Sequence, residues 1–270
     1  MIQKIKNRIV RKVENIQFKI FSNLLKKYNV EFFFKDKMGI LTKRKYDDNF
    51  KYIFKTKNSC DAVPLMEALN EKIKDSKVSI DIGANIGITT IWIAKNSERV
   101  YSFEPEKENI KRFNENLEAN NINNVILFQE AVSNEVGELE LNILESYGHH
   151  SLGKVATSKI LGTQKVNVVT LTEFCKEQNI QKIDFLKIDV EGFEIEVFEG
   201  ARELFENNSI KTVAFEISEV PLKSLDKTEE EIFDFLASVN YKVLNLDGSQ
   251  FDTKKYDKIV HLDLIAEPLD

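Results

Sequence analysis

Four positions in one short stretch of the chain have the residue types and the spacing of a ligand-binding turn. The segment VSIDIGANIGITT, residues 78–90, places Asp81, Gly83, Asn85 and Gly87 where an apolar run gives way to a turn and then to a helix-like pattern. Two classes of nucleotide-like ligand compete for such a turn. A dinucleotide requires G-x-G-x-x-G, because the second glycine lets the pyrophosphate approach the backbone. Asn85 occupies that position here, and the Asp81 carboxylate would repel a pyrophosphate but attract a cation at close range.

S-adenosylmethionine has the charges that this turn requires, since it carries an ammonium, a sulfonium and no phosphate. The two glycines would keep the turn tight and let the methionine moiety lie against the backbone. The cofactor's carboxylate would face the N-terminus of the helix that starts near residues 88–90, where backbone N–H groups bind anions. The turn therefore favours S-adenosylmethionine, and a nucleotide-cofactor oxidoreductase that uses NAD is the alternative.

An acidic residue also closes the second strand-like segment. Glu104 lies 23 residues after Asp81 in SFEP, where it can accept hydrogen bonds from both hydroxyls of a ribose. Dinucleotide-binding folds use the same geometry, so Glu104 alone does not discriminate between the two cofactors. Ala131 and Val132 follow the segment NVILFQE, and we expect them to form a small apolar wall for an adenine ring. The structural alternatives are that Glu104 is only an exposed glutamate at a strand end and that Ala131 and Val132 only continue the chain after a strand.

Residues that could remove a proton from a substrate cluster after the later strand-like segments. If the transferred group is a methyl, its carbon is already activated by the sulfonium, so the enzyme aligns the acceptor and takes its proton. Glu191 and Glu194 lie in DVEGFE, Lys187 just precedes it, and His149 and His150 lie in SYGHHSLG. A neutral imidazole suits a hydroxyl proton near pH 7. Helix capping by Glu191 and a solvated histidine loop are the structural alternatives. The candidate catalytic residues are Glu191, His150 and Lys187.

Three carboxylates offer a different way to activate a hydroxyl. Asp189, Glu191 and Glu216 could hold one divalent cation that lowers the pKa of the acceptor. Three carboxylates near one sheet edge are weak evidence for a metal site, because such a group could bind any of several hard cations or could bind no cation at all. The use of a metal is therefore left open.

Strand-like and helix-like segments alternate from Val78 to the end of the chain. Such alternation predicts an α/β fold, a doubly wound and mainly parallel seven-stranded sheet with helices on both faces. The last two strand-like segments, YKVLNL and KIVHLDLIAEP, are separated by a short loop, so we expect them to pair antiparallel. Ligands of such sheets bind beyond the carboxyl ends of the strands, which places the site near residues 81–90.

The N-terminal residues have a different composition. Residues 1–45 hold 13 Lys or Arg against 3 Asp or Glu, whereas the remaining 225 residues hold 25 against 41. Apolar positions recur every three or four residues from Ile2 to Ile20, which predicts a basic amphipathic helix. Short strands and a helix are expected to follow, so we divide the chain into an extension, residues 1–76, and a catalytic domain, residues 77–270. Residues 1–27 would pack on the domain, self-associate or lie on an anionic membrane surface.

The composition narrows the class of protein and its compartment. The chain has 270 residues, of which 42% are hydrophobic and 30% charged, as in globular proteins. Cys60 and Cys175 form no spacing motif, which favours a reducing compartment. No apolar run reaches the ~20 residues of a membrane span, and the N-terminus lacks the apolar core of a signal peptide. We expect a cytoplasmic protein, with peripheral attachment to the inner membrane surface as an option, and no nucleic-acid partner.

Four motifs, taken in order, resemble one known family. DIGANIG, SFEP, EAVS and FLKIDVEGFEIEVFEGA are similar to the FkbM-type S-adenosylmethionine-dependent methyltransferases over about residues 78–220, and K-I-D-V-E-G-x-E is the more diagnostic motif. The resemblance implies a class I methyltransferase fold with strand order 3-2-1-4-5-7-6. It also implies O-methylation of a hydroxyl, as is usual in the family. By position it implies cofactor contacts from Asp81, Gly83, Asn85, Gly87 and Glu104, with Asp189 beside them. The full set of predicted cofactor residues adds Ala84, Thr89, Pro105, Ala131 and Val132.

The motifs and the residue chemistry together predict an O-methyltransferase that acts on a hydroxyl. The expected acceptor is a sugar in a glycan or a polyketide-like metabolite. A non-catalytic scaffold that the basic helix recruits to membranes is the non-enzymatic alternative.

Overall fold

The chain divides into two compact units, Met1–Ser59 and Cys60–Asp270. The computed structural model describes residues 19–20, 22–24, 27, 31–44, 62–144, 160–256 and 259–269. In the first unit, β1 (Phe32–Lys35) and β2 (Leu41–Arg44) form an antiparallel pair, and Asp36 closes the turn by accepting bonds from Met38 N and Ile40 N. Most of the predicted basic helix lies outside the described residues, so its contacts stay a prediction.

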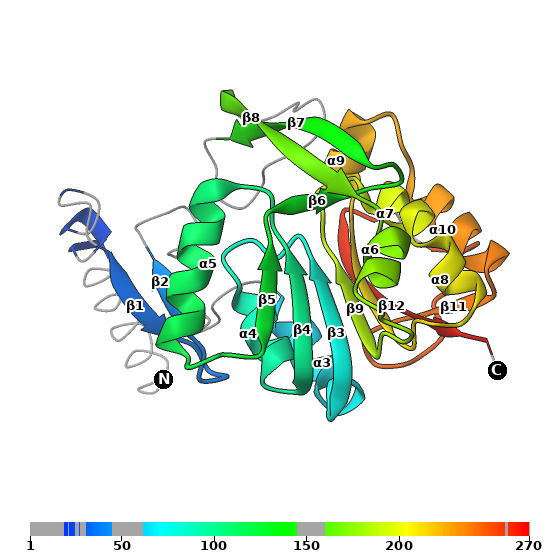
Figure 1. The fold of residues 1–270 in the computed structure, drawn as a ribbon, viewed down its shortest axis with the longest axis horizontal. Coiled ribbons are helices and arrows are strands. Elements are labelled where there is room, and N and C mark those ends of the chain that lie inside the picture. Colours follow the sequence, from blue (N-terminus) through cyan, green and yellow to red (C-terminus); the bar gives the residue numbers. More distant parts are fainter. Residues whose placement is uncertain are drawn as a thin grey trace, which may run out of the picture. The chain divides into compact units, whose positions relative to one another are not determined.

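The second unit is built on a seven-stranded sheet with the order β11-β12-β10-β9-β3-β4-β5 (Figure 1). Numbered along the chain within this sheet, the order is 3-2-1-4-5-7-6, which confirms the predicted fold class. β12 pairs antiparallel with β11, as the short loop between them predicts, and it also pairs antiparallel with β10. The strands are β3 (Ser76–Ile82), β4 (Ser97–Phe103), β5 (Val125–Phe128), β9 (Phe185–Ile188), β10 (Val213–Ser218), β11 (Tyr241–Leu244) and β12 (His261–Pro268).

Helices cover both faces of this sheet. A buried core joins one face to α6 (Leu171–Glu177), α7 (Glu194–Gly200), α8 (Arg202–Glu206) and α10 (Glu229–Ser238). On the other side lie α3 (Val63–Ile73) and α4 (Ile88–Ala94), and α5 (Lys107–Ala119) packs against α4. Residues 194–206 form two short helices, because the helix is interrupted at Ala201 and divides into α7 and α8. A short helix that the sequence does not indicate, α9 (Glu219–Ser224), follows β10.

Strand alternation decides which side chains reach which face. Ile80 and Ile82 of β3 are buried in the core beside α6 and α7, together with Leu186 and Ile188 of β9. Because neighbouring residues of a strand point to opposite faces, Asp81 and Lys187 point to the other face. The α7 face is sealed by buried aromatic rings in mutual contact, which include Phe198, Phe205, Phe215, Phe235 and Tyr241.

A second, three-stranded sheet is inserted between β5 and α6. It contains β6 (Glu130–Val132), β7 (Gly137–Leu144) and β8 (Ile160–Val169) in the order β6-β8-β7. The segment NVILFQEAVS is divided between the two sheets, because β5 pairs with β4 whereas β6 leaves the main sheet and pairs with β8. Gln164 of β8 donates a hydrogen bond to the carbonyl of Pro105 at 2.7 Å, which ties this sheet to the loop after β4.

None of the helices in the described ranges combines the length and the apolar composition that a bilayer crossing requires. The helix α3 belongs to the second compact unit, and the boundary between residues 76 and 77 stays a prediction about the catalytic domain.

Candidate functional site

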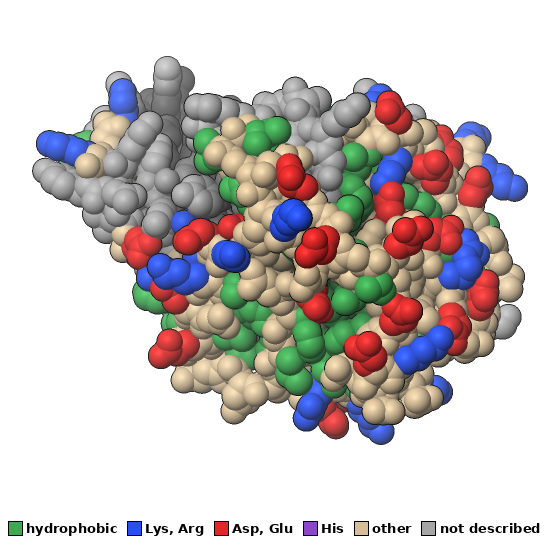
Figure 2. All heavy atoms as spheres, turned by 45° about the horizontal axis from the view of Figure 1, so that its top comes forward, with side chains coloured by type: hydrophobic (Ala, Val, Ile, Leu, Met, Phe, Trp, Pro, Cys, Tyr) green, Lys and Arg blue, Asp and Glu red, His purple; other side chains and the backbone are tan. Residues whose placement is uncertain are grey.

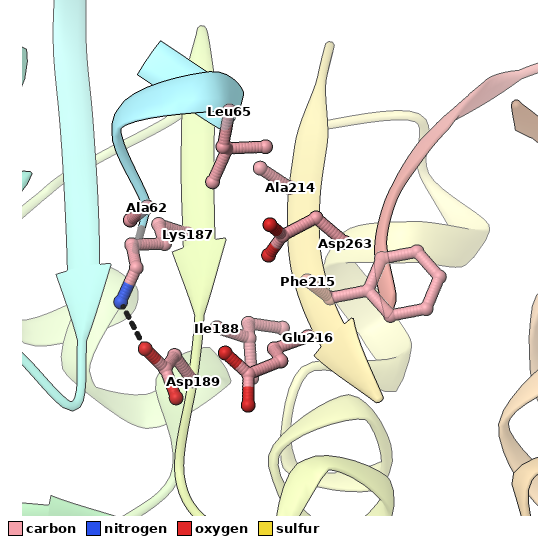
Figure 3. A pocket seen from close by; sticks show the side chains of 9 residues that line it. All are labelled: Ala62, Leu65, Lys187, Ile188, Asp189, Ala214, Phe215, Glu216 and Asp263. Carbon is pink, nitrogen blue, oxygen red and sulfur yellow. Dashed lines mark hydrogen bonds and ion pairs between the residues drawn. The ribbon is translucent and has the colours of Figure 1, made fainter. Parts of the chain in front are cut away.

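Charged side chains from four strands share one face of the main sheet near its carboxyl edge. Asp81 of β3 lies opposite Lys187 of β9, and Glu216 of β10 lies opposite Asp263 of β12. Residues opposite each other in register point to the same face, and so does Asp189, two residues after Lys187. Figure 3 shows the Lys187 ammonium and the carboxylates of Asp189, Glu216 and Asp263 around one hollow. The strands therefore bring together residues that are up to 182 positions apart in the chain (263 − 81 = 182).

Residues 83–87 form the turn between β3 and α4, which we call the glycine turn. Its backbone has positive φ angles, which residues other than glycine rarely adopt. Gly83 and Gly87 have φ of +79° and +84°, and Asn85 adopts φ of 51°. A Cβ at Gly83 would lie 1.8 Å from the carbonyl oxygen of Asp189, and a Cβ at Gly87 would lie 2.8 Å from the Phe113 ring. Both glycines are therefore required by the chain's own packing, independently of any ligand.

Glu104 fixes this turn from the neighbouring strand. Its carboxylate accepts bonds from the backbone N–H of Asn85 at 2.8 Å and of Glu106 at 2.9 Å, and from the Asn109 amide at 3.2 Å. The side chain is buried, and this burial raises its pKa to about 7 although the three donors oppose the rise. Since a carboxylate offers about four acceptor positions, the three donors leave about one for a ligand hydroxyl.

A buried ion pair joins the two central strands beneath the glycine turn. The Lys187 ammonium lies 3.0 Å from Asp189 Oδ2 and 3.7 Å from Asp81 Oδ1. Thr90 of α4 donates a hydrogen bond to the other Asp81 oxygen at 2.5 Å. Burial alone would lower the pKa of Lys187, but the two carboxylates raise it well above its ordinary value. Lys187 is thus held as a cation, and this favours a structural charge over its predicted role as a proton acceptor, which stays untested.

The burial of Asp81 changes how it can act. Its side chain is fully buried, and burial raises its pKa, which Lys187 and Thr90 partly offset. One of its oxygens, Oδ1, has no hydrogen-bond partner among the described residues. Asp81 would therefore influence a cationic ligand through its charge and through Thr90, because a fully buried carboxylate has no surface for direct contact.

The loop after β9, residues 189–192, which we call the DVEG loop, borders the glycine turn. Glu191 and Gly192 have φ of 54° and 98°, a left-handed pair that reverses the chain before α7. Glu194 in the first turn of α7 accepts bonds from the backbone N–H of Val190 at 3.2 Å and of Gly192 at 3.1 Å. Burial raises the pKa of Glu194 to about 8 against the effect of these donors. Glu194 is therefore unsuited to direct contact with a substrate, whereas Glu191 is partly exposed.

A pocket opens beside this loop on the α3 side of the sheet (Figure 3). Burial raises the pKa of Asp263 to about 6, and the carboxylates of Glu216 and Asp189 add to the rise. Glu216 accepts a hydrogen bond from Ser218 at 2.8 Å and lies 3.3 Å from His261. The pocket thus has a polar, acidic floor. Its lining residues are Ala62, Leu65, Lys187, Ile188, Asp189, Ala214, Phe215, Glu216 and Asp263.

The structure does not support the metal alternative in the form predicted. Asp189, Glu191 and Glu216 do not form a ligand set, since no group of three or more His, Cys, Asp or Glu in the described ranges is arranged to hold a metal ion.

Other predicted cofactor residues lie around the same edge or in the core. Thr89 is in the first turn of α4, and Pro105 follows Glu104 and is tied to β8. Ala131 and Val132 are both buried, Ala131 against residues of β7 and β8 and Val132 in the main core. Their role as an adenine wall stays a prediction. Ala84 is buried within the glycine turn. His149 and His150 lie outside the described residues.

Three residues of this site are not among those predicted from the sequence. Thr90 and Asn109 hydrogen-bond to Asp81 and Glu104, and their positions near the start of a helix that follows a strand could have indicated contact with the strand ends. Asp263 had no such signal, because its place depends on the register of β12 against β10.

The surface around the carboxyl edge is electrostatically mixed. Figure 2 brings this edge forward, and on the described part of the face acidic and basic side chains interleave. That part of the face shows no continuous basic surface of the kind that a nucleic-acid backbone requires.

Comparisons with known proteins match this geometry to one family. A family model described as the methyltransferase FkbM domain matches residues 81–243. The hexuronic acid methyltransferase AglP of Haloferax volcanii is 28% identical over 158 residues, which are 58% of this chain and 61% of that protein. Methyltransferase 1 of Beauveria bassiana is 26% identical over 150 residues, 47% of this chain and 59% of that protein. The match thus spans about three fifths of the length of these curated relatives.

One solved structure of a protein from the same family resembles this chain. The crystal structure of methyltransferase FkbM from Methylobacillus flagellatus KT is 15% identical, covers 72% of this chain and 43% of that chain, and has a TM-score of 0.46.

Loss of the buried ion pair should reduce stability in a non-additive way. Lys187→Met leaves two carboxylates without their cation and should cost about 3–5 kcal/mol of unfolding free energy. Asp81→Asn leaves Lys187 paired with Asp189 and should lower the unfolding free energy by about 1–3 kcal/mol. In urea unfolding, the double variant with Lys187→Met and Asp81→Asn should lose at least about 1 kcal/mol less unfolding free energy than the two single variants lose together. The exposed pair Lys165 and Glu138, 3.7 Å apart, serves as the control and should couple by under about 1 kcal/mol. Additive losses at the buried pair would contradict its role.

Two buried glutamates should make stability fall as the pH rises. The pKa values of Glu104 and Glu194 are about 7 and about 8, above the ordinary value of 4.5, so the folded state binds more protons than the unfolded state. Their stabilising contribution is present below about pH 4.5 and is lost as the pH rises through 7 and 8. Melting temperatures between pH 5 and 9 should decline less steeply in Glu104→Gln and Glu194→Gln than in the wild type. Glu98→Gln, at an exposed position, should keep the wild-type slope. Parallel curves for all four proteins would refute this.

Proposed function

The chain belongs to the FkbM methyltransferase family, and on this premise we propose that it transfers a methyl group from S-adenosylmethionine to a hydroxyl of a sugar or of a polyketide-like metabolite. The observation that carries the proposal is the meeting of the glycine turn and the DVEG loop, where the Asp189 carbonyl lies in the space left by the missing Gly83 side chain. Both segments lie at the carboxyl edge of parallel strands, where ligands of doubly wound sheets bind. The activity and acceptor of the whole protein are part of the proposal, because the match covers 61% and 59% of the two curated relatives.

The residues around the glycine turn fit this cofactor in charge and in hydrogen bonding. Glu104 retains about one acceptor position, which suits a ribose hydroxyl. Asp81, Glu104 and Asp189 surround the turn with carboxylates, which favour a cation and repel the pyrophosphate of NAD. When bound, S-adenosylmethionine supplies a methyl group already activated by its sulfonium. The cofactor would be held by Gly83, Asn85, Gly87 and Glu104, together with the other predicted residues Ala84, Thr89, Pro105, Ala131, Val132 and Asp189. Asp81, the remaining predicted residue, would act on it through its charge, because its carboxylate is buried.

The chain's own work in the reaction is to place the acceptor hydroxyl and to receive its proton. Glu191 and His150 are the proposed proton acceptors, and Asp263 joins them because its pKa of about 6 lies near the range that suits general bases. Lys187 is held as a cation by two carboxylates, so we propose that it fixes Asp189 in place.

The acceptor class is inferred from the pocket beside the DVEG loop. The carboxylates of Asp189 and Glu216 are partly exposed at this pocket, and they can accept hydrogen bonds from hydroxyls of a sugar that lies over it. The relative from Haloferax volcanii is named for a hexuronic acid, which carries a carboxylate. In this chain three carboxylates face one ammonium, and that ammonium is already paired. We therefore propose an uncharged sugar in preference to a uronic acid.

Cofactor binding should distinguish methyl transfer from NAD chemistry. S-adenosylhomocysteine should raise the melting temperature, and saturation at 100 times its Kd corresponds to about 2.7 kcal/mol. NAD at the same concentration should have no effect. Glu104→Gln should weaken S-adenosylhomocysteine binding about tenfold or more, since it removes the charge that a ribose hydroxyl meets. Glu108→Gln, at an exposed position on α5, is the control and should bind as the wild type does. Stabilisation by NAD alone would refute the proposed cofactor.

The acidic pocket should select acceptors by charge. With methyl β-glucoside and methyl β-glucuronide as matched acceptors, the wild type should show a kcat/KM about tenfold or more higher for the neutral sugar, because like charges repel at close range. Asp263→Asn should narrow this ratio, whereas Glu177→Gln on α6, an exposed acidic position on the opposite face, should leave it unchanged. Preference for the glucuronide in the wild type would overturn the neutral-acceptor assignment.

A further inference from the structure

Glu194 is a buried carboxyl that the proposed reaction does not use. Its side chain is 3% exposed, and Oε1 accepts backbone hydrogen bonds from Val190 and from Gly192. The second oxygen, Oε2, is buried without a hydrogen-bond partner among the described residues. Burying an unpartnered carboxyl oxygen costs free energy that an apolar side chain of similar size would not cost. Packing alone therefore does not account for a carboxyl at this position.

The segment that Glu194 holds has an unfavourable backbone. Glu191 adopts φ of 54°, a conformation that residues other than glycine rarely adopt, and Gly192 follows at φ of 98°. Residues in such conformations persist only where their surroundings enforce them. A Cβ at Gly192 would lie 3.0 Å from the backbone of Pro221, so the loop is also packed closely against α9. The two N–H groups that Glu194 binds lie on either side of Glu191.

We propose that Glu194 is a positioning residue, whose carboxyl fixes the DVEG loop so that Glu191 keeps its place beside the glycine turn. The inference rests on the methyl-transfer function proposed above. Glu194 acts through the loop backbone, since its burial excludes contact with substrate. The pKa of about 8, raised by burial, shows that the chain holds this carboxyl in an environment that disfavours its charge.

The glycine turn has its own anchors, which makes the role of Glu194 separable. Gly83 N and Ala84 N both donate to the carbonyl of Phe103, at 3.1 and 2.9 Å. Asn85 N donates to Glu104. None of these bonds involves the DVEG loop, and Asp189 at the start of that loop is held separately, by its ion pair with Lys187 and by its N–H bond to the carbonyl of Ile82 at 3.1 Å. Loss of Glu194 should therefore disturb the alignment of the acceptor while the affinity for cofactor changes little.

Lys227 supports the same loop from outside and supplies a control. Its ammonium donates to the carbonyl of Gly192 at 3.4 Å, pairs with Glu196 and lies 4.5 Å from the centre of the Phe193 ring. Lys227 reaches only one carbonyl of the loop, and it does not reach the N–H groups around Glu191. Its loss should cost stability without releasing those N–H groups.

The test compares three variants of the full chain. Glu194→Met keeps the approximate volume and removes both acceptor oxygens, Glu194→Gln keeps one oxygen that can accept both bonds, and Lys227→Met is the control. Hydrogen exchange at the amides of Val190 and Gly192, kcat and KM for a hydroxylated acceptor, and S-adenosylhomocysteine affinity are measured on each. Melting temperatures establish that each variant is folded.

The expected pattern separates positioning from stability. Glu194→Met should lose about tenfold or more of the exchange protection at residues 190 and 192 and about 10- to 100-fold in kcat, with cofactor affinity changed less than about threefold. Glu194→Gln should restore both readouts, and Lys227→Met should keep kcat near the wild-type value. Unchanged exchange and kcat in Glu194→Met, or equal losses in the Gln variant, overturn the inference. If the wild type transfers no methyl group and binds no S-adenosylhomocysteine, the proposed function fails, whereas the exchange data still decide the role of Glu194.

Discussion

The buried ammonium of Lys187 is the interaction on which the carboxyl edge of the sheet depends. It joins Asp81 of β3 to Asp189 after β9, and these two strands lie side by side at the centre of the sheet. A charge in that position requires partners, because an unpaired buried ion is strongly destabilising. The pairing fixes the ends of both strands relative to each other. The glycine turn and the DVEG loop begin at those ends, so the geometry of both follows from this pair.

Two further carboxyls extend the same principle to the backbone. Glu104 accepts the Asn85 N–H of the glycine turn, and Glu194 accepts two N–H groups of the DVEG loop. Burial raises the pKa of each carboxyl. Each also accepts hydrogen bonds from two backbone N–H groups that have no acceptor in a neighbouring helix or strand. Irregular backbone at a ligand site is thus held by buried acidic side chains. A methyltransferase needs such rigidity, because its rate depends on how well donor and acceptor are aligned.

Most of the fold and the position of the site could be predicted from the sequence, because both follow from local patterns. The alternation of segments predicts the α/β class, and the short loop before β12 predicts its antiparallel pairing with β11, whereas the strand order is what the family resemblance implies. Asp81 and Glu104 are identified by their places after apolar runs. The second sheet was missed because β6 leaves the main sheet only through its pairing with β8. Asp263 was missed because strand register is a long-range property. The roles of Asp81 and Lys187 follow only from their burial in the structure. Residue type and spacing alone indicate neither that the carboxylate is inaccessible nor that the lysine is held as a cation.

A structure of the protein with S-adenosylhomocysteine bound tests the central claim most directly. The account predicts that the ribose lies within hydrogen-bond distance of Glu104 and that the amino-acid moiety lies along the glycine turn, with the sulfur directed toward the pocket that Asp189, Glu216 and Asp263 line. Density for the ligand on another part of the chain would contradict the account. The same holds for a sulfur directed away from this pocket, because the acceptor would then have to enter from a different side of the sheet.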